Sequence, residues 1–300
     1  MNTKDKEKII KAGKIASQVI AHSKTFIKKG MPLLEIAEKI ESEIVKLGGK
    51  PAFPTNLSIN EIAAHYSPAH DDTTLANGLL KVDLGVQIEG FVADTAFSID
   101  LENSSENKNL IKAAEEALKS AIKLIESKKS KTTLGNIGKE IESTMENNKC
   151  IPISNLSGHS IEQNDLHSGL TIPNINTNSD IEIETGLIAI EPFSTLKSAS
   201  GKIHDGAHST IYQVISDKPL RNPTSREVLK FIIENYSTLP FCERWLYKKF
   251  QNRTNLALRD LVSNGNIHNY TQLVESTKSK VAQAEHTLLI EKDKVIVTTE

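Results

Sequence analysis

Two aspartates, Asp83 and Asp94, occupy an apolar segment that reads as a β-hairpin, residues 79–99. Glu89-Gly90 lies at its centre and suits a two-residue turn, because such turns need residues that tolerate a left-handed backbone. With this turn, the numbers of paired residues sum to 179. The hairpin therefore fixes which side chains share a face of the sheet, and this constrains the rest of the chain more than any other feature.

Under this register Asp83 faces Ala96 and Asp94 faces Gly85, so the two aspartates are diagonal neighbours on one face. Ionised carboxylates at this spacing repel each other and are costly to bury, which predicts bound cations and most directly a dinuclear metal site. The alternative is that one aspartate is solvated beside the turn and the other is a cap or a salt-bridge partner. Further ligands elsewhere in the chain would favour the metal site.

The composition indicates a globular chain without a strong electrostatic preference. It has 300 residues, 38% of them hydrophobic, and 36 basic against 38 acidic side chains, which excludes a broad basic surface for nucleic acid. No apolar run approaches the roughly 20 residues of a membrane span, and no apolar secretory signal opens the chain, so we expect a cytoplasmic protein. Cys150 and Cys242 lie far apart without a Cys-x-x-Cys pattern. Metal ligands are therefore expected to be oxygens and imidazoles.

Hydrophobic periodicity divides the chain into helical and strand-like segments. Helices are expected over residues 9–26, 33–47, 109–127 and 133–147, and strands over 52–59, 79–99 and, joined by functional loops, within 151–212. Residues 217–280 read as mostly helical, and 281–299 return to strand character. Because strands flank the helical stretch, we expect one sheet-based domain, 1–216 and 281–300, with a helical insertion, 217–280.

Three further residues could complete a metal site. His159 follows Gly158, Glu191 ends an apolar run, and Glu285 alternates away from an apolar face. Taken singly, they could be a surface loop histidine, a solvated strand end and an exposed strand residue. With the two aspartates they supply four carboxylates and one imidazole, which suit two divalent ions about 3.5–4 Å apart. The set fits Co, Mn, Fe, Zn or Ni and does not choose among them.

At these positions the chain resembles the type II methionine aminopeptidases, in the short form without a long amino-terminal extension. The similar segments are residues 52–66, the hairpin, 158–163, 190–193 and 282–287, in the family's order over nearly the whole chain. The resemblance implies the pita-bread fold, an α+β architecture in which a curved antiparallel sheet flanked by helices holds two metal ions. It also implies a helical insertion, which the stretch 217–280 fits.

The resemblance assigns metal ligands residue by residue. It implies that Asp83 binds one metal, that Asp94 and Glu285 bridge both, and that His159 and Glu191 complete the shell of the second. The resemblance thus gives roles to the two aspartates of the hairpin and to the three further candidates, for which the residues alone leave other interpretations open.

The resemblance also implies residues that contact the substrate. His65 and His167 match the two substrate-contacting histidines, and Phe53, Leu166 and His204 match positions near the pocket for the methionine side chain. Two other positions depart from the family pattern. Ala284 stands where an aromatic residue is usual, and Asn164 replaces a common tyrosine. Neither is a proposed ligand, so these departures bear on the shape and support of the pocket, not on the expected activity.

The expected reaction is removal of the N-terminal methionine from newly made proteins. A metal-activated hydroxide would attack the carbonyl after the first residue, while Glu191 relays a proton towards the leaving amine. A metal and His167 would stabilise the oxyanion, and His65 would orient or protonate the leaving nitrogen. The expected partners are nascent polypeptides, with ribosome association as a further expectation and with neither a membrane nor sequence-specific nucleic acid.

Two other functions are compatible with the same fold. A non-catalytic relative that binds RNA, the ribosome or protein partners would be expected to lose metal ligands and to gain a basic tail, and the chain shows neither change. A Xaa-Pro dipeptidase normally carries an additional amino-terminal domain. Only about fifty residues precede the segment 51–53, and the insertion also argues against that class.

Overall fold

The computed structural model describes residues 2–300, which form seven α-helices and fifteen strands. The helices are α1 (Thr3–Phe26), α2 (Leu33–Lys46), α3 (Ser105–Lys128), α4 (Leu134–Asn147), α5 (Pro223–Tyr236), α6 (Glu243–Phe250) and α7 (Arg253–Ser263), with a 3-10 turn at Lys129–Lys131. The strands are β1 (Lys50–Ile59), β2 (Ile62–Ala64), β3 (Leu79–Ile88), β4 (Phe91–Asp100), β5 (Cys150–Pro152), β6 (Ser157–Ile161), β7 (Thr171–Pro173), β8 (Gly186–Ile190), β9 (Phe193–Leu196), β10 (Ile203–Val214), β11 (Phe241–Cys242), β12 (Ile267–Glu275), β13 (Val281–Gln283), β14 (His286–Ile290) and β15 (Val295–Val297).

The hairpin of β3 and β4 has the predicted register. Asp83 pairs with Ala96, and Asp94 pairs with Gly85. The turn residues Glu89-Gly90 have φ of 52° and 85°, the left-handed conformation that a two-residue hairpin turn requires. β1 pairs with the other edge of β3 to give the sheet order β1-β3-β4.

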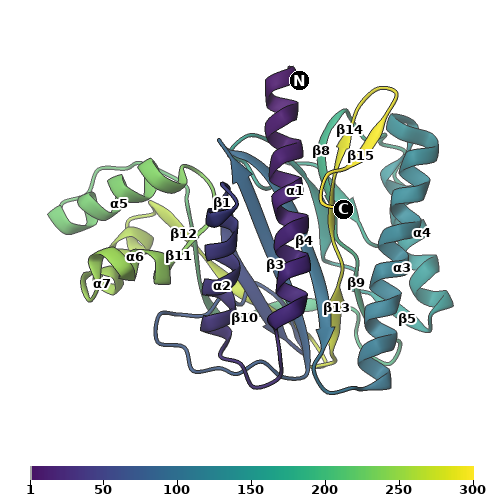
Figure 1. Ribbon diagram of the computed structural model, residues 1–300, viewed down its shortest axis with the longest axis horizontal. Coiled ribbons are helices and arrows are strands. Elements are labelled where there is room, and N and C mark those ends of the chain that lie inside the picture. Colours follow the sequence, from purple (N-terminus) through teal and green to yellow (C-terminus); the bar gives the residue numbers. More distant parts are fainter. Residues whose placement is uncertain (1) are drawn as a thin grey trace.

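Helices α1 and α2 cover one face of this sheet (Figure 1). Their apolar stripes pack into one buried cluster with Leu80, Val82, Leu84 and Val86 of β3. Because side chains alternate between the faces of a strand, Asp83 must point to the opposite face. The hydrophobic core therefore lies on the side of the sheet that α1 and α2 cover. Asp83 lies on the other side, which is called the concave face below.

The second half of the fold repeats this arrangement. Helices α3 and α4 bury their apolar faces against strands that include β8 and β14 (Figure 1). The strands form a five-stranded sheet, β15-β14-β8-β6-β7, and a three-stranded sheet, β13-β9-β5. An isolated bridge between Ala96 and Glu285 joins β4 to the segment before β14. This bridge brings the two halves into contact at the concave face.

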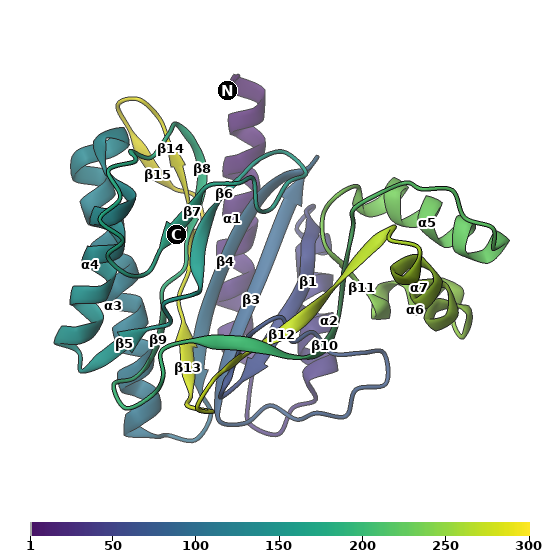
Figure 2. The ribbon, with the colours of Figure 1, turned by 180° about the vertical axis from the view of Figure 1, so that it is seen from behind.

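The inserted segment is less helical than expected. Helices α5, α6 and α7 share a buried apolar cluster, but helix ends at Ser263, and residues Ile267–Glu275 form β12. β12 pairs with β10 and β2 in the order β11-β10-β12-β2, and β10 and β12 cross the face opposite α1 and α2 (Figure 2). The stretch 217–280, expected to be mostly helical, therefore also contains a long strand, because pairing with β10 decides the conformation there.

The carboxyl-terminal segment is packed against the first helix. A Cβ atom built on Gly13 of α1 would lie 2.0 Å from the carbonyl oxygen of Thr298, so only glycine allows this approach. Thr298 in turn donates its backbone N–H to the carbonyl of Thr287 at 2.9 Å. Within residues 2–300, no helix combines the length and the hydropathy that a membrane crossing needs.

Candidate metal centre

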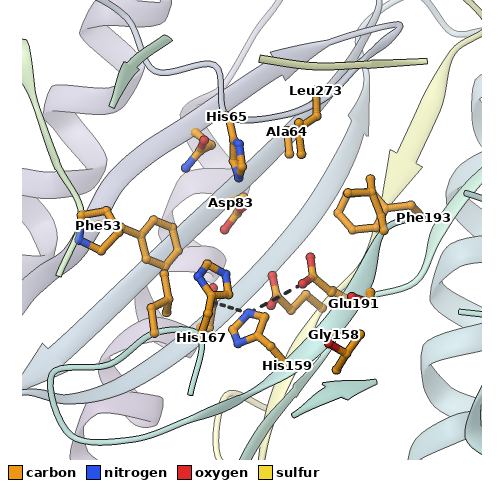
Figure 3. Close-up of a pocket in the computed structure, with 18 of the residues that line it drawn as sticks. Phe53, Ala64, His65, Asp83, Gly158, His159, His167, Glu191, Phe193 and Leu273 are labelled. Carbon is orange, nitrogen blue, oxygen red and sulfur yellow. Dashed lines mark ion pairs between the residues drawn. The ribbon is translucent and has the colours of Figure 1, made fainter. Parts of the chain in front are cut away.

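The five predicted ligands line a single cavity of about 400 Å³ on the concave face (Figure 3). Asp83 and Asp94 come from the hairpin strands β3 and β4. His159 comes from β6, Glu191 directly follows β8, and Glu285 lies between β13 and β14. Residues separated by up to two hundred positions in the chain therefore converge on one site.

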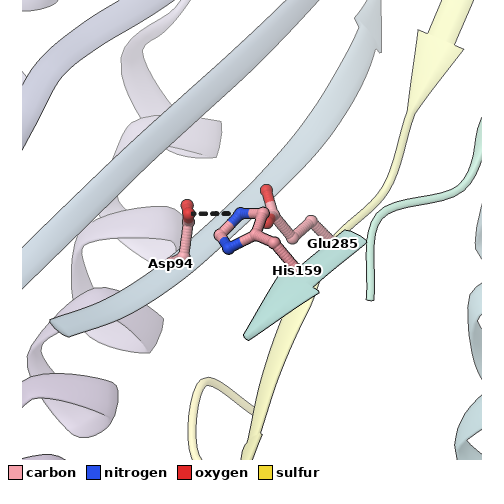
Figure 4. Close-up of side chains that lie close together, drawn as sticks. All are labelled: Asp94, His159 and Glu285. Carbon is pink, nitrogen blue, oxygen red and sulfur yellow. Dashed lines mark ion pairs between the residues drawn. The ribbon is translucent and has the colours of Figure 1, made fainter. Parts of the chain in front are cut away.

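The distances within this group are short. Asp94, His159 and Glu285 each offer a ligand atom within 4.8 Å of the others (Figure 4). His159 Nε2 lies 3.6 Å from a carboxylate oxygen of Asp94 and 3.6 Å from one of Glu191. The Gln283 side chain links the group further, since its Nε2 donates to Glu191 at 3.5 Å and to Glu285 at 3.4 Å.

Backbone contacts hold Glu285 beside the hairpin. Its N–H donates to the carbonyl of Ala96 at 3.0 Å, and its carbonyl accepts the Thr95 hydroxyl at 2.9 Å. Both partners belong to β4, the strand that carries Asp94. The carboxylates of Asp94 and Glu285 are therefore placed relative to each other by the sheet itself.

The negative charges of the four carboxylates are unfavourable in this buried site unless a cation is bound. Burial raises the pKa of Asp83 to about 7. Burial and the neighbouring carboxylates raise the pKa of Asp94, Glu191 and Glu285 well above the ordinary range. Such shifts mean that the charged forms lack compensation from the protein. A bound cation would supply it.

His159 is prepared to bind through a nitrogen lone pair. Burial, with a smaller effect from His167, lowers its pKa to about 3, so the imidazole is neutral near pH 7. Its Nδ1 lies 3.4 Å from the carbonyl oxygen of Ser160, which favours a proton on that nitrogen. Nε2 then presents a lone pair to the carboxylates of Asp94 and Glu191, which are acceptors as well. A metal ion between them would accept all of these lone pairs and so remove their mutual repulsion.

Buried oxygen atoms support the same interpretation. Within the described residues, Oδ1 of Asp83, Oδ1 of Asp94 and Oε1 of Glu285 are buried without a hydrogen-bond partner. Buried acceptors are normally satisfied, so three such atoms around one cavity require an explanation. The donor set of carboxylates and one imidazole fits divalent metal ions.

His65 lies in the same cavity as a neutral side chain. Burial lowers its pKa to about 4. Its Nδ1 lies 3.1 Å from the carbonyl oxygen of Thr271 and its ring packs edge-on against Tyr270, with 5.2 Å between ring centroids. A proton on Nδ1 leaves Nε2 as an acceptor. His65 is therefore suited to orienting an N–H group of a substrate. It is less suited to protonating a leaving nitrogen, which was the other role expected from the sequence.

An apolar pocket adjoins the carboxylates. Phe53, Leu166 and His167 line it as expected, and the His167 ring packs against His159 with 4.3 Å between centroids. Sequence reasoning missed several lining residues, including Asn56, Ala64, Phe193, Ile211, Pro240, Tyr270 and Leu273. No local period reveals Tyr270 and Leu273 as strand residues, because the apolar and aromatic positions 267, 270, 273 and 274 are spaced as in a helix.

His204 does not take part in this pocket. It lies on β10 opposite Val274, is exposed, and lies outside the set of cavity-lining residues. The structure therefore does not bring His204 to the cavity, although the resemblance implied a position near the methionine pocket. His204 precedes the register irregularity of β10 between Asp205 and His208, and β10 lines the cavity further along, at Ile211.

The two departures from the family pattern occupy different places. Ala284 lines a separate groove between α1 and α3, together with Ile20 and Phe97, on the side away from the carboxylates. It therefore does not shape the substrate pocket. Asn164 lies in the loop between β6 and β7 that carries Leu166.

The sequence matches known proteins over nearly its whole length. The model of metallopeptidase family M24 matches residues 7–291. The chain is 44% identical over 296 residues to a methionine aminopeptidase from Methanocaldococcus jannaschii, covering 98% of each chain. It is also 44% identical over 301 residues to a methionine aminopeptidase from Pyrococcus horikoshii, covering 99% of this chain and 100% of the relative.

Solved structures show the same fold. A thermophilic Arx1 superposes with a TM-score of 0.86 at 17% identity, covering 99% of this chain and 91% of the other. A methionine aminopeptidase from Thermotoga maritima superposes with a TM-score of 0.70 at 22% identity, covering 100% and 98%. These likenesses confirm the expected α+β pita-bread architecture. The family model spans nearly the whole chain, and the relatives named above are 44% identical to it. The chain therefore belongs to metallopeptidase family M24, whose members depend on divalent metal ions.

Proposed function

We propose that this protein is a methionine aminopeptidase that removes the first residue from polypeptides beginning with methionine. The observation that carries the proposal is one cavity that joins a buried group of four carboxylates and an imidazole to an apolar pocket. The relatives of high coverage that bear this name support it. Nascent polypeptides are then the substrates, and the cytoplasm, where they emerge, is the proposed location.

Two divalent ions are proposed to occupy the centre. Asp83, Asp94, His159, Glu191 and Glu285 would hold them, and four negative charges would balance two dications. When bound, such ions lower the pKa of a coordinated water and polarise the carbonyl that is to be cleaved. Their identity stays open among Co, Mn, Fe, Zn and Ni.

The remaining steps use side chains of this protein. Glu191, ionised when it serves as a ligand, would take the proton released by the attacking water and pass it towards the leaving amine. Neutral His167 donates a ring N–H to the developing oxyanion. His65 accepts an N–H of the substrate at Nε2, because its Nδ1 is engaged by the Thr271 carbonyl. The Asp83 end of the cavity receives the free α-amino group, which limits cleavage to one residue.

The apolar pocket would receive the first side chain. Phe53 and Leu166 are buried and belong to one apolar cluster beside the carboxylates. A flexible thioether chain fills such a surface without leaving a polar group unsatisfied. Methionine selectivity is expected to come from this pocket.

Release of methionine from a Met-Ala-Ser peptide by the metal-loaded protein tests the proposal. We expect turnover by the wild type, loss of turnover after chelation, and a rate at least a hundredfold lower for Asp94→Ala. His204→Ala is a matched control, because His204 is exposed outside the cavity, and it should retain wild-type turnover. A wild type that fails to release methionine with any of the five metals would refute the proposal.

The two other functions predict different results in the same assay. Hydrolysis of a Xaa-Pro dipeptide in place of Met-Ala-Ser would identify a dipeptidase. Ribosome association stays a prediction, and co-sedimentation of the protein with ribosomes in the presence and absence of high salt would test it.

A further inference from the structure

Asn164 lies where three segments that are distant in the sequence meet. Its backbone N–H donates to the carbonyl oxygen of Gly90 at 2.9 Å, in the turn of the β3–β4 hairpin. Its carbonyl oxygen accepts the hydroxyl of Thr238, which lies between α5 and β11. One residue thus connects the β6–β7 loop to the hairpin and to the inserted helical segment.

The backbone conformation of Asn164 makes this junction possible. Its φ is 59°, in the left-handed region that asparagine and glycine adopt more readily than other residues. A Cβ atom at Gly90 would lie 2.3 Å from Oδ1 of Asn164, so the turn and the loop are in direct contact. Gln163 adds a second hydrogen bond, from its Nε2 to the carbonyl of Glu89 at 2.9 Å.

The residues next to this junction form a wall of the cavity. Leu166 and His167 follow Asn164 in the same loop, and Pro240 follows in the inserted segment; all three line the cavity. Leu239, only 2% exposed, belongs to the same apolar cluster as Leu166. A movement at the junction would therefore shift both sides of the apolar pocket.

We propose that Asn164 is a positioning residue that sets the width of the pocket for the first side chain of the substrate. It does so by joining the loop of Leu166 and His167 to the inserted segment that carries Pro240. The inference rests on the proposed function, because pocket width matters to the reaction only if that side chain enters here. Asn164 reaches no reacting atom, so loosening the junction should affect KM and selectivity more than kcat.

Thr238 offers the sharpest test, because its hydroxyl joins the loop to the inserted segment and a side-chain substitution removes it cleanly. Thr238→Val deletes the donor, and Thr238→Ser keeps it. With the metal-loaded protein, we expect Thr238→Val to raise KM for Met-Ala-Ser by about fivefold, as loss of one hydrogen bond predicts, with kcat within about twofold. The ratio of kcat/KM for Met-Ala-Ser over Leu-Ala-Ser should fall, and Thr238→Ser should restore both values.

Variants of Asn164 separate positioning from stability. Asn164→Gly retains the left-handed backbone and both backbone hydrogen bonds, so it should keep KM near the wild-type value. Asn164→Ala should raise KM. Asn178→Ala is the control for Asn164→Ala, because it places alanine at a similar left-handed backbone position. Asn178 has φ of 52° and lies in an exposed loop outside the cavity. It should lower Tm without changing KM.

The rate of backbone amide hydrogen exchange in residues 162–168 reports on the junction independently of any enzyme assay. Faster exchange in Thr238→Val than in Thr238→Ser supports the proposal, and equal exchange overturns it. Wild-type KM and selectivity in both Thr238→Val and Asn164→Ala would also overturn it, even if Tm fell. A wild type without methionine release would instead refute the proposed function, and the exchange rates would still decide whether the junction holds the loop.

Discussion

The hydroxyl of Thr287 bonds to both backbone groups of Asp94. It accepts the Asp94 N–H at 2.8 Å and donates to the Asp94 carbonyl at 2.8 Å, across 193 positions of sequence. Thr287 lies on β14, two residues after Glu285. One buried side chain thus joins the strand that carries Asp94 to the strand that follows Glu285.

Thr287→Val should therefore weaken both the fold and the centre. The substitution preserves shape but leaves a buried N–H and carbonyl unsatisfied, which should lower the free energy of unfolding by about 1–3 kcal/mol. Urea unfolding of the metal-free protein measures this loss, and titration with Mn²⁺ should show weaker binding. Thr287→Ser keeps the hydroxyl and is the matched control. Equal stability of the valine and serine variants would contradict the assignment.

Metal binding should release protons and strengthen as the pH rises. Burial raises the pKa of Asp83 to about 7, so a cation competes with a proton there until the pH exceeds that value. We expect Mn²⁺ affinity to increase from pH 6 to pH 8. Calorimetry in two buffers of different ionisation enthalpy counts the protons released, and Asp83→Asn should release fewer. Affinity independent of pH across this range would contradict the prediction.

His65 should make the protein sensitive to acid. Burial lowers its pKa to about 4, below the ordinary 6.5, so the unfolded chain takes up a proton first as the pH falls. The stabilisation is complete above pH 6.5 and is lost towards pH 4. Relative to His65→Asn, whose asparagine tolerates the left-handed backbone at this position (φ 66°), the wild type should lose about 2 kcal/mol between pH 7 and pH 5. Parallel stability curves for the two proteins would argue against a neutral buried imidazole.

A buried ion pair attaches the inserted helices to the rest of the protein. Glu41 of α2 accepts both terminal nitrogens of Arg244 at 2.7 and 2.8 Å and Trp245 Nε1 at 2.9 Å. Removing one partner leaves a buried charge, so Arg244→Met should cost about 3–5 kcal/mol of unfolding free energy. The exposed pair of Lys230 and Glu234 is the control, and Lys230→Met should cost little. Equal losses in the two variants would contradict this assignment.

Ala284 offers a stabilising substitution. It faces a groove whose lining includes Leu118 and Ile122 of α3, on the side away from the carboxylates. Ala284→Phe should fill this groove and raise the free energy of unfolding by about 1 kcal/mol, with methionine release unchanged. Thermal unfolding measures the gain. A lower Tm would mean that the groove cannot admit the ring.

Local patterns account for the parts of the fold that the sequence predicted. Turn chemistry at Glu89-Gly90 and alternation along β3 and β4 act over a few residues, so the hairpin register is confirmed to the residue. β12 was not predicted, because its conformation depends on pairing with β10, about sixty positions earlier. Long-range pairing of this kind has no local signature.

The candidate site shows the same division. The five proposed ligands were found because acids and a histidine in apolar segments are chemically conspicuous. Tyr270 and Pro240 were missed because they are ordinary residues that only the path of the inserted segment brings to the cavity. His204 was misplaced because the sequence does not show that β10 reaches the cavity only further along, at Ile211.

The contact between Gly13 and Thr298 has a consequence for how the protein is made. The space beside Gly13 of the first helix is filled by Thr298, which follows β15 near the other end of the sequence, and Glu285 also lies late in the sequence. During translation, the emerging amino-terminal half would hold Asp83 and Asp94 without their remaining partners. A shorter chain that stops before Glu285 would therefore lack one of the proposed ligands, and it should bind divalent ions more weakly than the chain that includes this residue.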